Sequence, residues 1–143
     1  MAEELVSSDI DLRFAVVTTT LEDTPRGNEL QSRLASRCTI HRAEERPLRA
    51  LAGTENPQGV LVVARVPQVR LPDAQIDSTA RVLVCDGVQD PGNLGTLVRV
   101  ADAFSAAAVI LLPGSVDPWN PKVVRSAAGS SFHLPIITAE VGE

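Results

Sequence analysis

The chain has 143 residues, of which 44% are hydrophobic and 22% charged, and its formal net charge at pH 7 is −5. This length predicts about one ordinary domain, and the composition excludes a disordered tail, a collagen-like chain and a coiled coil. The longest apolar stretch, residues 106–113, is much shorter than the roughly 20 residues that cross a bilayer. The acidic N-terminus is typical of neither a secretory signal nor a transit peptide. We therefore expect a cytoplasmic protein without membrane contact, or an organellar one if a transit peptide is missing.

The first part of the chain alternates strand-like and helix-like segments. β-Branched residues predict the strands, Leu30 and Leu34 predict one face of an amphipathic helix, and Gly53 is the expected C-cap of a second helix. The predicted elements are strands at residues 13–20, 38–42 and 59–66 and helices at residues 27–37 and 44–52. This order predicts a small α/β domain over residues 1–67.

Residues 68–80 lack a sustained hydrophobic period and predict a linker. Beyond it, strands and helices alternate over residues 81–143, and Pro121 falls in the first turn of a helix, where its missing N–H costs nothing. The predicted elements of this part are strands at residues 81–86, 107–112 and 134–137 and helices at residues 94–104 and 120–128. Strands that alternate with helices of about ten residues predict an α/β fold with parallel pairing and right-handed crossovers.

The net charge divides unevenly along the chain. Residues 1–23 carry a net charge of −5, residues 24–70 carry +4 and residues 71–143 carry −4. All the basic residues of the middle segment are arginines, which suit bidentate phosphate contact: Arg26, Arg33, Arg37, Arg42, Arg46, Arg49, Arg65 and Arg70. Two interpretations remain open, a solvated helix surface and an RNA-facing patch. For the RNA-facing patch, the expected contacts are Arg42, Arg46 and Arg49.

The two cysteines, Cys38 and Cys85, stand in apolar strand-like runs with neither a CxxC spacing nor a nearby histidine. We expect two buried thiols, and neither a disulfide framework nor a metal site. The aromatic residues are few and scattered: Phe14, Phe104, Trp119 and Phe132. RNA-binding modules that stack bases on a sheet need clustered aromatics, so the sequence excludes that class of module.

A Gly/Pro/Asn loop follows the first strand of the second part, and such loops bind ligands in α/β proteins. Gly87 and Gly92 have the spacing of a P-loop, but no Lys-Ser/Thr pair follows them. Gly92 and Gly95 lack the first glycine of a dinucleotide-binding motif. A nucleotide-binding enzyme is therefore disfavoured. What remains is a turn with Asn93 at a helix N-cap and Arg99 about one and a half turns into that helix.

Two motifs stand out in this part of the chain. The first is DPGNLGTLVRVADA at residues 90–103, and the second is NPKVVRSAAG at residues 120–129. Together they resemble motifs of the SpoU (TrmH) family of RNA ribose 2′-O-methyltransferases. Residues 45–67 also resemble the end of the small ribosomal-protein-like RNA-binding domain that precedes the catalytic domain in many members.

The resemblance implies an α/β fold in which a small RNA-binding domain precedes a parallel-sheet methyltransferase domain with a deep trefoil knot. Residues 81–143 would be the N-terminal part of that knotted domain. The resemblance further implies S-adenosylmethionine as methyl donor, a homodimer, and a ribose 2′-hydroxyl of rRNA or tRNA as acceptor.

The family's motif residues fall on Asn93, Arg99, Arg125 and Ser126 of this sequence, and Lys122 stands in the same stretch as the last two. Asn93 and Arg99 are expected to be catalytic, and Lys122, Arg125 and Ser126 are expected to help place RNA. A guanidinium is a poor base, so we expect Arg99 to orient the ribose or a phosphate and to stabilise the developing alkoxide. The structural alternatives are an N-cap role for Asn93 and a surface ion pair for Arg125.

The sequence also departs from the family. Glycine is usual where Ser105 stands, so a different turn is expected after that helix. The segments that form the knot and hold the methyl donor have no counterpart after residue 137. We therefore expect no cofactor-binding residue in this chain, which we interpret as an internal fragment or short isoform, inactive alone.

Two further expectations concern function and behaviour. A non-catalytic RNA-binding or ribosome-associated protein that uses the arginine-rich part is the alternative hypothesis. A parallel sheet that stops after about three strands leaves an unpaired apolar edge. The sequence therefore predicts self-association or marginal stability.

Overall fold

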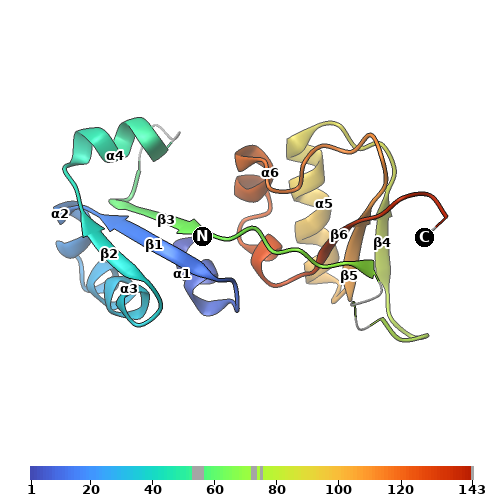
Figure 1. The fold of residues 1–143 in the computed structure, drawn as a ribbon, viewed down its shortest axis with the longest axis horizontal. Helices are drawn as coiled ribbons and strands as arrows, with labels where there is room; N and C mark the ends of the chain where they lie inside the picture. Colours follow the sequence, from blue (N-terminus) through green and yellow to red (C-terminus); the bar gives the residue numbers. More distant parts are fainter. Residues whose placement is uncertain (53–56, 72–73, 75, 143) are drawn as a thin grey trace. The chain divides into compact units, whose positions relative to one another are not determined.

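Figure 1 shows the chain as a computed structural model, which describes residues 1–52, 57–71, 74 and 76–142. The fold is a mixed α/β arrangement of two compact units, an N-terminal unit (Ala2–Arg65) and a C-terminal unit (Val66–Glu143). Within the described residues, each unit is built around one three-stranded sheet. Across the same residues, no helix combines the length and the apolar character that crossing a membrane requires.

The N-terminal unit contains all the strands and helices predicted for it. Its elements are α1 (Ala2–Ser7), β1 (Leu12–Val17), α2 (Thr19–Glu22), α3 (Pro25–Ala35), β2 (Thr39–Arg42), α4 (Glu45–Ala52) and β3 (Val60–Ala64). The short helices α1 and α2 are additional. Because α2 starts at Thr19, β1 is shorter than the predicted strand. The expected C-cap at Gly53 lies outside the described residues.

The sheet of the N-terminal unit has the order β2-β1-β3. β1 and β2 are parallel, as predicted, but β1 and β3 are antiparallel, with Val17 opposite Val60. The prediction of parallel pairing is therefore wrong for β3. Just past the end of β1, the N–H of Thr18 donates to the carbonyl oxygen of Gly59 at 2.9 Å, just before β3 begins. The chain thus enters β3 from the end of the sheet at which β1 ends, and it must run back along β1.

The C-terminal unit has the predicted alternation of strands and helices. Its elements are β4 (Val82–Cys85), α5 (Pro91–Ala103), β5 (Ala108–Leu111), α6 (Pro121–Ser126), the 3₁₀ helix η2 (Ser130–Phe132) and β6 (Ile136–Thr138). The sheet order is β4-β5-β6 and both pairs are parallel, which confirms the prediction for this part. α5 and α6 lie on one side of this sheet (Figure 1). Val84 of the edge strand β4 is 55% exposed, and the expected self-association stays a prediction.

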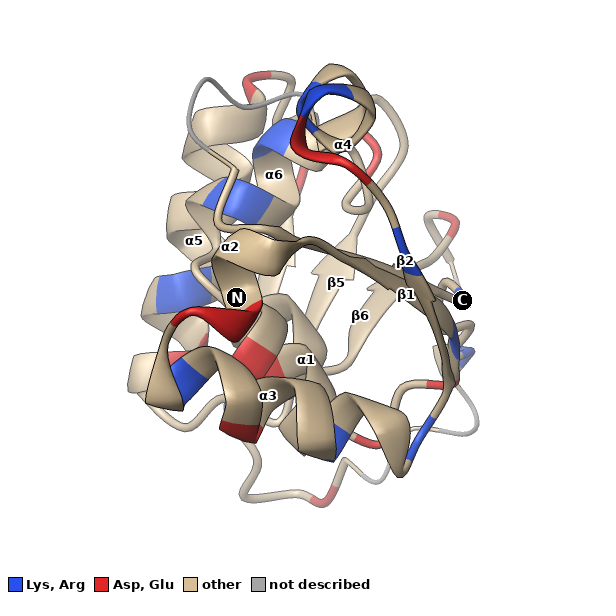
Figure 2. Cartoon of the chain, turned by 90° about the vertical axis from the view of Figure 1, so that its left-hand side faces the viewer, with Lys and Arg blue, Asp and Glu red and all other residues tan. Residues whose placement is uncertain are grey.

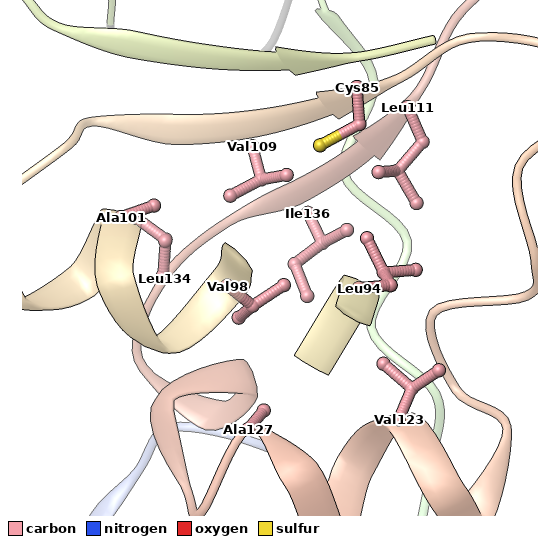
Figure 3. Packing of buried hydrophobic residues seen from close by; sticks show 10 residues of the cluster. All are labelled: Cys85, Leu94, Val98, Ala101, Val109, Leu111, Val123, Ala127, Leu134 and Ile136. Atoms are coloured by element: carbon pink, nitrogen blue, oxygen red, sulfur yellow. The ribbon is translucent and has the colours of Figure 1, made fainter. Parts of the chain in front are cut away.

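The core of the C-terminal unit lies between the sheet and its two helices (Figure 3). Leu94 and Val98 of α5 and Val123 of α6 are fully buried, and each such side chain contributes roughly 1.5–3 kcal/mol to folding. Cys85 is also buried there, as predicted, and burial raises the pKa of its thiol. Cys38 is only half-buried, because it lies in the bend before β2 rather than inside a strand.

The turn after α5 keeps the conformation that glycine usually takes. Ser105 has a φ of 53°, in the left-handed region. Its N–H donates to the carbonyl of Asp102 at 2.8 Å, and the N–H of Ala106 donates to the carbonyl of Ala101 at 2.9 Å. These two bonds form a Schellman motif, which satisfies carbonyls at the helix end. The expectation of a different turn is therefore wrong: these bonds hold serine in the strained region at a cost of roughly 1–2 kcal/mol.

Candidate functional site

The first motif forms the start of α5. Asp90 is the N-cap residue, and its carboxylate accepts a hydrogen bond from the N–H of Asn93 at 2.8 Å. Pro91 occupies the first helical position. The prediction of Asn93 as N-cap is therefore wrong, because Asp followed by Pro already provides the cap and the first residue of the helix. The exposed side chain of Asn93 is left available for a ligand.

The second motif forms the start of α6. The side-chain oxygen of Asn120 accepts a hydrogen bond from the N–H of Lys122 at 2.9 Å, and Pro121 occupies the first turn, as predicted. The ammonium of Lys122 lies 4.0 Å from the carboxylate of Asp90, the cap of α5. Both side chains are more than half exposed, so this ion pair adds little stability. It does show that the two helix starts are neighbours.

α5 and α6 come into very close contact at Gly95. A Cβ atom on Gly95 would lie 2.4 Å from the Cβ of Ser126 and 2.6 Å from the carbonyl oxygen of Val123. Only glycine permits this approach of the two helices. Ser126 is half-buried at this contact, so the structure gives this RNA-binding candidate a packing position.

Arg99 lies one helical turn beyond Gly95 on the same side of α5. Relative to Asn93 it is turned by about 120° around the helix axis and displaced by roughly 9 Å along it. Arg99 and Arg125 are exposed, and within the described residues neither side chain makes an ion pair or hydrogen bond. Figure 2 shows the basic positions of α5 and α6 on adjacent helices. Each motif helix thus carries one exposed guanidinium group.

Ser115 is a residue of this site that sequence reasoning missed. It lies in the loop after β5, and its hydroxyl accepts a hydrogen bond from the N–H of Val88, in the loop after β4, at 3.2 Å. The N–H of Val116 donates to the carbonyl of Val88 at 2.9 Å. These bonds close the two loops on each other at the carboxyl edge of the sheet. A serine in a glycine- and proline-containing loop carries no local signal for such a contact.

Most arginines of the N-terminal unit are engaged within that unit. Arg26 binds Glu3 at 2.5 Å, and Arg42 binds Glu22 at 2.8 Å. Arg37 binds no carboxylate in the described part of the chain, and its guanidinium donates to backbone carbonyls at the end of α1. Residues 2–65 carry eight Arg and ten Asp or Glu, a net charge of −2. The positive middle segment is thus neutralised by the acidic segment that precedes it.

Two basic side chains of the N-terminal unit lie on α4. Arg46 and Arg49 are exposed, and in the described part of the chain they make no hydrogen bond or ion pair. Figure 2 shows the basic positions on this helix. An RNA phosphate at Arg42, in contrast, would have to compete with the carboxylate of Glu22. Of the three predicted contacts, the structure therefore leaves two available on α4.

A parallel sheet with two capped helices on one side, and with loops closed on each other at its carboxyl edge, defines a layered α/β domain. The model of the SpoU rRNA Methylase family matches residues 80–142. This part of the chain belongs to the SpoU rRNA methylase family.

Curated relatives match over more than half of the chain. The 23S rRNA (guanosine(2553)-2′-O)-methyltransferase RlmP of Bacillus subtilis is 46% identical over 88 residues, which cover 62% of this chain and 34% of that protein. The mitochondrial rRNA methyltransferase 3 of Homo sapiens is 41% identical over 85 residues, which cover 57% of this chain and 20% of that protein. The chain thus spans between a fifth and a third of the length of these relatives.

Solved structures match nearly the whole chain. The AdoMet-bound rRNA methyltransferase from Sinorhizobium meliloti has a TM-score of 0.84 and 26% sequence identity, and the match covers 98% of this chain and 51% of that one. A structure described as an RNA 2′-O ribose methyltransferase has a TM-score of 0.73 and 31% identity, with coverage of 97% and 52%. The chain spans about half the length of these proteins.

Proposed function

We propose that this chain is part of an S-adenosylmethionine-dependent RNA ribose 2′-O-methyltransferase that acts on rRNA or tRNA. In this proposal residues 81–143 are the N-terminal part of the knotted catalytic domain, and residues 1–67 are an RNA-binding domain joined to it by a linker at 68–80. The observation that carries the proposal is the contact of the two motif helices at Gly95, inside a segment of the SpoU family. A homodimer is proposed for the full-length protein.

The catalytic role falls to Arg99, with Asn93 beside the start of the same helix. The guanidinium stays protonated at any physiological pH, so Arg99 acts as a fixed positive charge rather than as a base. It would hold a phosphate of the RNA and stabilise the oxyanion that develops on the ribose 2′-oxygen. The side-chain amide of Asn93, exposed on the third residue of the helix, would orient the ribose through hydrogen bonds.

RNA is contacted by basic side chains of both units in this proposal. Lys122 and Arg125 of α6 would bind phosphates near the reacting ribose, with Ser126 supporting the helix contact. Arg46 and Arg49 of α4 would bind phosphates elsewhere on the RNA. Arg42 would join them only after exchanging Glu22 for a phosphate. Contacts of this kind are lost with rising salt concentration, because bound counterions are released when phosphate is neutralised.

The methyl donor does not fit the described residues alone. A relative from Sinorhizobium meliloti binds AdoMet, and ligands of α/β folds bind beyond the carboxyl ends of the strands. Here the loops after β4 and β5 are closed on each other through Ser115 and Val88. A Cβ on Gly114 would lie 3.7 Å from the Cα of Gly87, which leaves no room for a nucleoside between them.

The test is transfer of tritiated methyl groups from S-adenosylmethionine to rRNA, followed by alkaline hydrolysis, which leaves 2′-O-methylated linkages intact. A product that disappears in Arg99→Ala supports the proposal, and a product that persists in this variant contradicts the role of Arg99. Absence of product, combined with salt-dependent RNA binding that Arg46→Ala/Arg49→Ala abolishes, favours the alternative of a non-catalytic RNA-binding protein. Calorimetry with S-adenosylmethionine is expected to show no micromolar binding to this chain.

A further inference from the structure

α4 is attached to the N-terminal unit by few side chains. Leu48 is the buried residue of this eight-residue helix, with 1% of its surface exposed. Leu51, which the sequence pattern places on the same face, is 74% exposed. An isolated helix of this length is marginal in water. Its orientation therefore depends on whatever else holds its first turn.

Glu45, the first residue of α4, supplies that attachment. Its carboxylate oxygen Oε1 accepts a hydrogen bond from the hydroxyl of Thr18 at 2.5 Å and another from the hydroxyl of Thr20. Thr18 directly follows β1 and is 2% exposed, and Thr20 belongs to α2. One carboxylate thus joins the start of α4 to the end of β1 and to α2. A carboxylate in the first turn also interacts favourably with the helix dipole.

The same two hydrogen bonds affect the ionisation of Glu45. The hydroxyls of Thr18 and Thr20 hold the pKa of Glu45 below its ordinary value, with a smaller contribution from the charge of Arg49 one turn further along α4. Glu45 is therefore ionised at neutral pH. A carboxylate beside an RNA-binding surface repels phosphate. The charge of Glu45 therefore does not explain why this residue stands next to Arg46 and Arg49.

We propose that Glu45 is a positioning residue for RNA binding: its bonds to Thr18 and Thr20 hold α4 in the orientation that presents Arg46 and Arg49 to the phosphate backbone. This inference rests on the proposed RNA-binding function and adds to it a residue that never touches RNA. The direction of the effect separates positioning from electrostatics. Removing a negative charge near RNA by itself strengthens binding, so a loss of affinity in a variant that stays folded points to a loss of positioning.

The experiment measures fluorescence anisotropy of a labelled single-stranded rRNA fragment with the whole chain at several salt concentrations. Glu45→Ala is expected to weaken binding about three- to tenfold. Glu45→Gln keeps an acceptor oxygen for the two hydroxyls and is expected to bind as tightly as the unchanged protein or more tightly. Glu44→Ala is the matched control, because it removes the same charge from an exposed neighbour whose side chain makes no hydrogen bond or ion pair within the described residues. It is expected to bind slightly more tightly.

A second variant covers the case in which Glu45→Ala loses its fold. Thr18→Val/Thr20→Val leaves Glu45 in place, removes both donors and is expected to weaken binding to a similar extent. Hydrogen exchange should then become faster in α4 while α3 stays protected. If Glu45→Ala binds as tightly as Glu44→Ala, or if α4 exchanges as slowly as in the unchanged protein, the positioning role is refuted.

Two variants of α4 separate RNA binding by this helix from the positioning role of Glu45. If Arg46→Ala/Arg49→Ala leaves RNA affinity and its salt dependence unchanged, α4 does not bind RNA, and the underlying function is refuted for this unit. If that variant loses affinity and Glu45→Ala does not, RNA binding by α4 stands, and Glu45 has no part in it.

Discussion

A Cβ atom on Gly95 would lie 2.4 Å from the Cβ of Ser126, so the two motif helices of the C-terminal unit meet where the missing side chain of Gly95 leaves room for that of Ser126. The neighbouring backbone is close as well, with the carbonyl oxygen of Val123 at 2.6 Å from the same point. The close contact sets the positions of Arg99 and Arg125 relative to each other. Arg99 lies one helical turn beyond Gly95, and Arg125 directly precedes Ser126.

Gly95→Ala is therefore expected to lower the free energy of unfolding of the C-terminal unit by about 1–3 kcal/mol, the usual cost of overpacking. Urea denaturation measures this. Thr96→Ala, on the exposed side of the same helix turn, is the control and should change stability by less than about 0.5 kcal/mol. Ser126→Gly should rescue part of the loss in the double variant, and additive effects of the two changes would contradict the contact.

Among the residues that the structure describes, two with a side chain occupy the left-handed region, Ser105 with φ 53° and Ala128 with φ 54°. Replacement of either by glycine removes the steric cost of the Cβ, offset by the greater freedom of glycine in the unfolded chain. We expect Ser105→Gly and Ala128→Gly each to stabilise the protein by about 0.5–1 kcal/mol, seen as a higher midpoint in thermal denaturation. Ala103→Gly, at the last residue of α5, should instead destabilise by up to about 1 kcal/mol, the cost of glycine in a helix interior. Equal destabilisation by all three changes would refute the assigned conformations.

Arg37 holds the end of α1 through its guanidinium. It donates to the backbone carbonyls of Val6 at 2.8 Å, Ser8 at 2.5 Å and Ile10 at 2.7 Å. Charged hydrogen bonds to carbonyls at a helix end are among the stronger ones. Arg37→Met is expected to cost about 1.5–3 kcal/mol of stability and to speed hydrogen exchange throughout α1.

Two further substitutions test this prediction, one that replaces Arg37 by lysine and one that removes Arg33. Arg37→Lys keeps the charge but cannot reach several carbonyls at once, so we expect it to lose most of the same stability. Arg33→Ala removes a guanidinium that donates only to the hydroxyl of Ser7 among the described residues, and it should have little effect. A fully stable Arg37→Met variant would show that α1 does not depend on this residue.

The free energy of unfolding should fall in acid, because carboxylates that form ion pairs with arginines become protonated there. The guanidinium of Arg42 lowers the pKa of Glu22 from its ordinary 4.5, and Gln31 adds to the shift. Arg26 lowers the pKa of Glu3 in the same way. A pKa that is lower in the folded state stabilises the protein above pH 4.5, and this stabilisation is lost as the pH falls through the folded-state value.

Unfolding curves at several pH values below 5 test this. Glu22→Gln should flatten the loss of stability between pH 4.5 and lower values, because its side chain no longer takes up a proton on unfolding. Glu29→Gln, an exposed change of the same charge on α3, is the control. A Glu22→Gln variant whose stability falls as steeply as that of the unchanged protein would contradict the role of this ion pair.

Much of the C-terminal unit was accessible from local patterns. Short apolar runs separated by helices of about ten residues predict a parallel sheet, and β4, β5 and β6 pair in this way. Pro121 marks the first turn of α6 because proline fits only there. In each case the structure depends on residues that are close together in the sequence, so the local sequence is enough to predict it.

The predictions that were wrong concern contacts between residues far apart along the chain. β3 runs antiparallel to β1, although its sequence is an apolar run like those of the parallel strands. The arginines of residues 24–70 suggested a free positive surface, but Arg26 binds Glu3 and Arg42 binds Glu22. Composition counts these charges without showing which of them neutralise one another.

The same distinction applies to the candidate site. Its motif residues can be recognised in the sequence because residue type and spacing within a short segment are enough to identify them. The family resemblance rests on these residues. The closeness of Gly95 to Ser126, the closing of two loops by Ser115 and the bond from Thr18 to Glu45 join residues that are 31, 27 and 27 positions apart. Such pairs form only when the strands have chosen their order and direction, because the return path of the chain decides which side chains meet.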